Sequence, residues 1–130
     1  MKPVVIGLLL CEQVIIEENT RNLTPVNSFN YRSVDAFPSE NIPFIIFALL
    51  TDGSGEMPLE VIIQRLDTLE SIYRRSQIVR FPDPLQEIRC MIRIRNCSFP
   101  VAGHYQAVLL IDRELVAQRK FAVRKREVSQ

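Results

Sequence analysis

Three arginines alternate with apolar residues on one short stretch of the chain, and arginine is the side chain best suited to bind anions. Arg89, Arg93 and Arg95 lie in this stretch, and the other parity carries Ile88, Cys90, Ile92 and Ile94. This period of two predicts a strand over residues 86–96 with the arginines facing outward, alternate side chains being about 6–7 Å apart. Guanidinium groups bind phosphate and carboxylate through paired donors, so the row is a candidate surface for an anion, a nucleic acid or an acidic partner.

A simpler interpretation of the same row is a solvated sheet face. Glu60, Glu87 and Glu114 are available to pair with the arginines, and charged side chains also keep an exposed strand from joining another chain. Surfaces that bind nucleic acids often interleave aromatic rings for base stacking, whereas this row offers Met91. We therefore favour the solvated face and keep anion binding as the alternative.

The single histidine is the second candidate for chemistry, because His104 stands between Gly103 and Tyr105. A histidine can activate a cysteine nucleophile, but no serine or cysteine here has the sequence context of a nucleophile elbow. The glycine permits an unusual backbone turn, and a tyrosine two residues later can bond its hydroxyl to nearby backbone, as in the tyrosine corner of sandwich folds. We interpret Gly103 and Tyr105 as a structural corner, and we predict no catalytic residue and no enzyme activity.

Residue types that bind metals are too sparse to predict a metal site. A set made of Cys90, Cys97 and His104 lacks a fourth ligand, and Cys90 is expected to face the core. The acidic turn residues lack the Asp-x-Asp spacing of a calcium loop; they are Asp52, Glu56, Asp83 and Asp112. We predict no metal and no cofactor. We also expect the three cysteines, Cys11 included, to be free in a reducing, cytoplasmic compartment.

Length and composition predict one domain over residues 1–130. A chain of 130 residues with 47% hydrophobic residues can bury a real core, and its net charge of +1 gives no general attraction to nucleic acid or anionic membranes. Lys2 and the apolar run that ends at Cys11 resemble a truncated lipoprotein signal, but Leu10 occupies the place of the small residue before the cleavage site. We expect a first strand there, no membrane segment, and a charged, frayed tail at 124–130.

Apolar runs place most of the expected strands. Val4–Cys11 and Phe44–Leu50 are continuous apolar runs of the kind found in strands buried on both faces. Residues 58–64 follow the second run after a turn that contains two glycines, which predicts a hairpin between 44–50 and 58–64.

Two stretches are less regular. Leu23–Val34 is expected to be one strand with Phe29 and Tyr31 facing inward. Residues 66–73 carry apolar residues at helical spacing, which predicts either a short helix or the start of the next strand.

The last strong pattern is a hairpin over residues 100–123 with a polar turn at 112–114. Val108 and Leu110 are expected to face outward, opposite the inward row of Tyr105, Ala107, Leu109 and Ile111. Outward aliphatics suggest that this strand is covered on its second side, either by residues 66–73 or by another protein. Together the patterns predict an all-β protein of seven to nine strands, a single antiparallel β-sandwich of immunoglobulin-like or C2-like form.

Several motifs resemble those of a family of small uncharacterised bacterial proteins. They are Leu9-Leu-Cys-Glu12, the run Phe44–Leu50 with Asp52-Gly-Ser-Gly-Glu56, Phe99-Pro-x-x-Gly-x-Tyr105, and Asp112 with Ala117-x-Arg119-x-Phe121-x-Val123. The resemblance extends over nearly the whole chain and implies a β-sandwich of immunoglobulin-like or C2-like shape. It implies no activity, because the family has none assigned.

The expected function is that of a non-enzymatic interaction or assembly module. The outward aliphatics and the two-sided run Val4–Leu10 exceed what one core requires, which predicts self-association or a protein partner bound through an apolar face or an edge strand. The alternative is an anion, nucleic acid or phosphorylated ligand bound by Arg89, Arg93 and Arg95.

Overall fold

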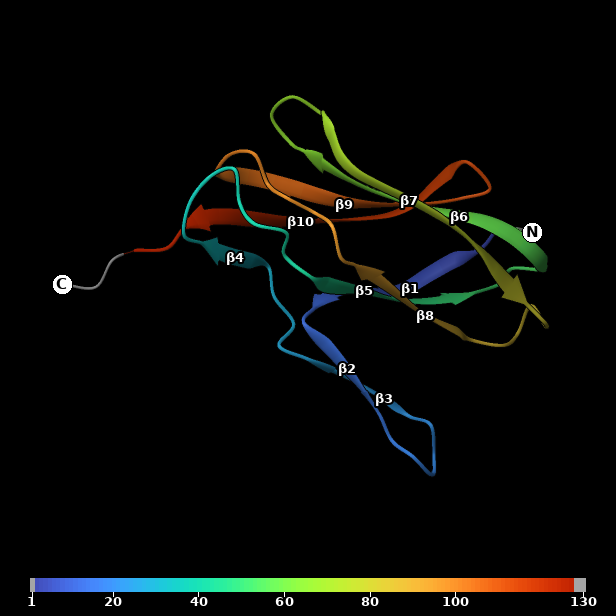
Figure 1. Ribbon diagram of the computed structural model, residues 1–130. Helices are drawn as coiled ribbons and strands as arrows, with labels where there is room; N and C mark the ends of the chain where they lie inside the picture. Colours follow the sequence, from blue (N-terminus) through green and yellow to red (C-terminus); the bar gives the residue numbers. More distant parts are fainter. Residues whose placement is uncertain (1, 128–130) are drawn as a thin grey trace.

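The computed structural model describes residues 2–127, and all of their regular structure is β-strand (Figure 1). The ten strands are β1 (Val4–Cys11), β2 (Gln13–Ile16), β3 (Leu23–Val26), β4 (Tyr31–Val34), β5 (Phe44–Thr51), β6 (Gly55–Arg65), β7 (Ser71–Phe81), β8 (Ile88–Ile94), β9 (Gly103–Ile111) and β10 (Glu114–Lys125). They form a three-stranded sheet in the order β1-β5-β8, a five-stranded sheet in the order β4-β10-β9-β6-β7, and the hairpin β2-β3. Residues 2–127 contain no helix that could cross a membrane.

The main core lies between the three-stranded and the five-stranded sheet. Buried residues of β5 and β8 meet those of β6, β9 and β10 in one apolar cluster. Both predicted alternations are confirmed, because the inward rows of β8 and β9 belong to this cluster; their buried members are Cys90, Ile92, Ile94, Tyr105, Ala107, Leu109 and Ile111. Full burial of a large aliphatic side chain stabilises a fold by about 1.5–3 kcal/mol, so these rows fix the strand registers.

The outer face of the three-stranded sheet is partly covered by the β2-β3 hairpin, which we call the arm (residues 13–26). Val14 and Leu23 of the arm pack against a second apolar cluster formed by Cys11, Ile45 and Phe47. Figure 1 shows the arm projecting from the body of the protein below β5 and β8. This cover explains why β5 and the Leu9–Cys11 end of β1 are apolar on both faces.

The predicted hairpin between residues 44–50 and 58–64 is wrong. β5 pairs with β1 and β8, whereas β6 pairs with β7 and β9, so the segment 52–54 carries the chain from one sheet to the other. This crossing is tight, because a Cβ atom on Gly53 would lie 2.5 Å from the Phe81 ring. A short glycine turn can join two strands of one sheet or pass between two sheets, and the sequence pattern does not separate the two cases.

The short helix considered for residues 66–73 does not form. The chain turns at residues 66–68, and β7 begins at Ser71. β7 is antiparallel to β6 from Gly55 to Gln64, a ladder that satisfies far more backbone groups than one isolated helical turn. Leu69, whose spacing suggested the helix, adopts a φ of 61° in the turn and is 63% exposed.

Residues 23–34 form two strands instead of the expected single strand. β3 ends at Val26, and Asn27 then turns the chain with a φ of 53°. Phe29 packs against the main core, but Tyr31 is 50% exposed and Val34 is buried, so the expected inward parity fails after the turn. β4 pairs in parallel with β10, which means that the fold is not purely antiparallel.

The strand count of ten also exceeds the seven to nine expected, because the arm contributes two short strands of its own. β10 continues to Lys125 beside β4, so residues 124–125 belong to the sheet and not to a tail. Residues 128–130 of the expected tail lie outside the described part of the chain.

The turn between β9 and β10 yields a stability prediction. Asp112 and Arg113 have φ values of 53° and 67°, the left-handed pair of a two-residue hairpin turn that favours glycine at its second position. Arg113→Gly is expected to raise the free energy of unfolding by about 0.5–1 kcal/mol, because it removes a side chain from a strained backbone position. Urea denaturation measures the change. Lys120→Gly in β10 is the control and should lower stability, and a loss in both variants would contradict the turn geometry.

Candidate functional site

The predicted arginine row lies on the outer face of β8. Arg89 pairs in register with Leu49 of β5 and Arg93 with Ile45, and all three arginines are exposed. Arg95 follows the end of the strand, so the structure places two members of the row on the sheet itself.

Of the acids expected to pair with the row, one lies near it. Glu87 has an oxygen 3.8 Å from Nε of Arg89. Glu60 instead pairs with Arg74 of β7. The row is therefore only partly neutralised by the described acids, which leaves it available as a cationic surface that could bind an anion.

A groove runs beside Arg89, between the tip of the arm and the outer face of the three-stranded sheet. It has a volume of about 370 Å³ and is lined by Asn22, Leu23, Phe47, Leu49, Glu87 and Arg89. Its floor is apolar and its rim is charged.

A larger hollow lies beside β4. This Arg32 hollow has a volume of about 420 Å³ and is lined by Glu12, Asn27, Ser28, Phe29, Asn30, Tyr31, Arg32, Ser33 and Arg126. A second hollow of about 300 Å³, along the loop after β4, shares Arg32, Ser33 and Arg126. Two guanidinium groups thus line both hollows.

The Arg32 guanidinium is mostly buried and has no carboxylate at hydrogen-bond distance. Its Cζ lies 4.8 Å from the centre of the Phe29 ring, and its side chain is only 21% exposed. The nearest carboxylate oxygen belongs to Glu12, 3.9 Å from one terminal nitrogen, and the other terminal nitrogen, Nη1, is buried without a hydrogen-bond partner. A buried donor without an acceptor costs about 1–3 kcal/mol, and more when the group is charged.

The predicted corner residues lie at the start of β9. The Tyr105 hydroxyl donates a hydrogen bond to the carbonyl oxygen of Val101 at 2.6 Å, and the tyrosine is fully buried. Burial raises the pKa of Tyr105. Gly103 has a φ of 147°, a conformation that side chains of other residues rarely adopt.

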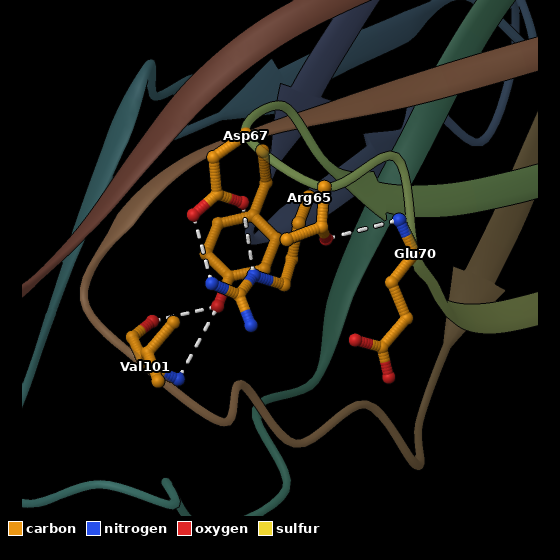
Figure 2. A network of polar contacts seen from close by, with 6 residues as sticks. Arg65, Asp67, Glu70 and Val101 are labelled. Atoms are coloured by element: carbon orange, nitrogen blue, oxygen red, sulfur yellow. Dashed lines mark hydrogen bonds and ion pairs between the residues drawn. The ribbon is translucent and has the colours of Figure 1, made fainter.

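An ion pair closes the same end of the five-stranded sheet. Arg65 donates two hydrogen bonds to Asp67, at 3.1 and 2.8 Å, and Figure 2 shows this pair between Val101 and Glu70. The hydrogen bond from Arg65 is the main reason why the pKa of Asp67 is lowered. Asp67 is largely exposed, so the pair orders the turn more than it stabilises the fold.

The cysteines and acids do not come together as a reactive centre. All three cysteines are buried and free, and burial raises the pKa of the Cys90 thiol to about 11 and that of Cys97 to about 12. They are therefore protonated at neutral pH and poor nucleophiles. His104 is exposed at the start of β9. Among residues 2–127, no three metal-ligating side chains are close enough to hold an ion.

The seam between β1 and β10 exposes apolar side chains. Val4 and Ile6 of β1 are 45% and 53% exposed, and Leu115 at the start of β10 is 50% exposed. Lys2 and Glu114 pair at 3.2 Å across this seam. The side chain of Arg119 donates to the carbonyl oxygen of Leu8 at 2.6 Å, which ties the edge strand β1 to the five-stranded sheet.

Comparison with known families identifies the chain. The model of a "Family of unknown function (DUF6941)" matches residues 7–124. The chain belongs to this family. The DUF6941 match spans every strand except the first residues of β1 and the last of β10, so the resemblance seen in the sequence extends to nearly the whole fold. A comparison with curated protein sequences gives no match.

A solved structure shares the fold. The chain is similar to the Pseudomonas fluorescens alkylpurine DNA glycosylase AlkC, which is bound to DNA containing an abasic site analog, with a TM-score of 0.54 and 10% sequence identity. The similarity covers 94% of this DUF6941 chain and 30% of the glycosylase chain. At this identity the likeness concerns the fold alone.

Sequence reasoning missed Arg32 and Arg126 as site residues. A continuous strand with Phe29 and Tyr31 inward puts Arg32 on the outer face, but the segment 27–30 between β3 and β4 is irregular, and the parity changes between Phe29 and Tyr31. One signal was present in the sequence. Arg32 and Val34 are two residues apart on a short strand and therefore lie on the same face, and Val34 faces the core. Arg126 had been placed in the tail.

The Tyr105 corner yields a prediction with a pH signature. Tyr105→Phe removes the hydrogen bond to Val101 and should lower the free energy of unfolding by about 0.5–1.5 kcal/mol near neutral pH. Because burial raises the pKa of Tyr105 in the folded protein, its contribution is complete below the unfolded pKa of about 10 and is lost as the pH rises above it. The wild type should therefore lose stability above pH 10 more steeply than the variant. Urea denaturation at several pH values measures this.

Tyr31→Phe is the matched control, because the Tyr31 ring is half exposed and no hydrogen bond from its hydroxyl is found within residues 2–127. It should change stability by less than about 0.5 kcal/mol. Equal effects of the two substitutions would show that the corner bond is unimportant.

Proposed function

We propose that the protein is a non-enzymatic, immunoglobulin-like interaction module of the bacterial cytoplasm that self-associates through the β1-β10 seam. The observation that carries the proposal is the grouping of Val4, Ile6 and Leu115, three exposed aliphatic residues around one sheet edge. The three buried, free cysteines support a reducing compartment.

The edge strand itself supports the proposal. β1 has the sequence VVIGLLLC, eight residues without a charge, and it pairs on one side only, with β5. Natural proteins usually protect such edges with charges, prolines or covering segments, because an apolar edge strand readily joins another chain. Here one arginine reaches a single carbonyl of the strand, and a second copy of the protein would cover the aliphatic residues beside it.

Sedimentation equilibrium over about 5–500 μM tests self-association, a range that spans weak to moderate homodimers. Ile6→Lys should weaken the dimer at least tenfold, because it places a charge in the seam. Ile6 lies at the irregularity between Val5 and Gly7, so the substitution leaves the β1-β5 ladder intact.

Ile78→Lys is the matched control. Ile78 is an isoleucine of β7 with 62% exposure, and β7 is the strand of the five-stranded sheet farthest from β4 and β10. The Ile78→Lys substitution should change the dissociation constant of the dimer less than twofold. A wild type that stays monomeric at every concentration would sink the proposal.

The alternative function is binding of a nucleic acid or another polyanion by the arginine row. The exposure of Arg89, Arg93 and Arg95 favours it, as does the sparse pairing of the row with acids. The DNA-bound glycosylase of similar fold makes duplex DNA a reasonable probe.

Replacement of Arg89, Arg93 and Arg95 together by alanine tests this alternative. If the row binds DNA, the triple variant should bind a duplex at least tenfold more weakly, and the salt dependence of binding should become shallower, because fewer counterions are released. A triple change of Arg74, Arg80 and Arg124, on β7 and β10, removes the same charge as a control, whereas Arg75 is left in place because it donates a hydrogen bond to the Arg93 carbonyl oxygen. Unchanged binding in the first variant would exclude the row as a DNA surface.

A further inference from the structure

Arg32 is placed where a charged side chain needs an anion. It shares its parity on β4 with Val34, which is buried in the main core, so its guanidinium lies on the inner side of the strand. Among the described residues, its Nη1 is the single buried side-chain nitrogen or oxygen without a hydrogen-bond partner. A buried guanidinium is normally paired with a carboxylate or another anion at hydrogen-bond distance. The 3.9 Å approach of Glu12 is too long for that.

The guanidinium is held in a fixed position. The Phe29 ring lies against it, with 4.8 Å from Cζ to the ring centre, and Phe29 packs in turn on Phe44 and Phe121 of the core. β4 is paired with β10 over its four residues, and the Arg126 amide donates to the Val34 carbonyl at 2.7 Å. A donor fixed in this way binds a ligand without a large loss of side-chain entropy.

The lining of the Arg32 hollow suits one negative charge. Arg32 and Arg126 bring two positive charges, and Glu12 brings the single negative charge of the lining. One Glu12 oxygen already accepts a hydrogen bond from the Asn27 amide at 3.0 Å. The other polar residues are neutral hydrogen-bonding groups, namely Ser28, Asn30, Tyr31 and Ser33.

Acidic side chains lie close to the basic ones around the hollow. Arg126 has an oxygen of Asp35 at 3.6 Å, and Glu40 lines the adjoining hollow. Arg124 lies over the Tyr31 ring, 3.7 Å from its centre, and does not line either hollow. Arg126 is thus shared with Asp35, and among the described residues the buried charge that lacks a close partner is that of Arg32, which argues for a small ligand and against an extended polyanion.

We propose that the Arg32 hollow binds the oxyanion group, carboxylate or phosphate, of a small polar molecule. The oxyanion accepts hydrogen bonds from the Arg32 and Arg126 guanidinium groups, and the neutral side chains bind the polar remainder. The hollow's volume of about 420 Å³ lies within the range of ordinary small-molecule sites. This site is separate from the β1-β10 seam and does not depend on self-association.

Titrations with inorganic phosphate and with acetate, followed in ¹H–¹⁵N spectra at constant ionic strength, test the site and distinguish its two chemistries. At least one anion should shift the amide signals of residues 27–33 saturably, with a Kd below about 20 mM, since a bare ion lacks the polar remainder of the true ligand. The tighter of the two identifies phosphate or carboxylate as the preferred group. The absence of a saturable shift with both anions would overturn the proposal.

Variants locate the binding. Arg32→Gln should weaken the anion at least tenfold, and Arg126→Gln should weaken it at least threefold. Arg32→Lys keeps the charge but loses the planar fork of donors, so it should also bind at least threefold more weakly, and it serves if the glutamine variant does not fold.

Arg124→Gln is the matched control, because it removes the same charge from β10, the strand beside β4, outside the hollow, and it should alter the Kd less than twofold. Wild-type affinity in both Arg32 variants would refute the site. An equal loss in the Arg124 variant would show a general charge effect and would refute it as well.

Discussion

The arrangement of the two sheets depends on the contacts that the Phe121 ring makes. Phe121 belongs to β10 of the five-stranded sheet, and its ring centre lies 6.3 Å from that of Phe44, on β5 of the other sheet. It also lies 5.9 Å from Phe99 and 6.0 Å from Tyr105. Aromatic rings bury large apolar areas and prefer the edge and offset arrangements seen here. One ring therefore joins both sheets, the loop before β9 and the corner tyrosine.

The same cluster connects the core to the hollow beside β4. Phe29 contacts Phe121 at 6.5 Å on one side and Arg32 on the other. The guanidinium thus lies at the outer end of a cluster of rings that contact one another edge to face. A charged group in this place is costly for the unliganded protein, and residues that are costly to the fold are commonly retained for binding.

Sequence patterns predicted the parts of the fold in which one strand faces one core. The alternation in β8 and β9 was readable, because Ile92 and Leu109 must point to the same apolar layer. Pairing between distant strands was not readable, as the β5-β6 crossing at Gly53 shows, since the partner of a strand is decided by packing between sheets. Arg89 and Arg93 were placed correctly on the outer face of β8, whereas Arg95 lies beyond the end of the strand. Arg32 was missed because the irregular segment 27–30 between β3 and β4 changes the parity, so that Phe29 and Val34 both face the core.

The tip of the arm and the crossing after β5 tolerate change very differently. The tip of the arm, residues 17–22, is exposed throughout and is held by hydrogen bonds within itself, such as that from the Glu17 amide to the Asn22 carbonyl oxygen. The crossing at Gly53 has no room even for a methyl group beside Phe81. Evolution can therefore lengthen, shorten or rewrite the arm tip without moving a sheet, whereas the crossing must keep its length and its glycine. Within DUF6941, diversity among relatives should accumulate on the arm.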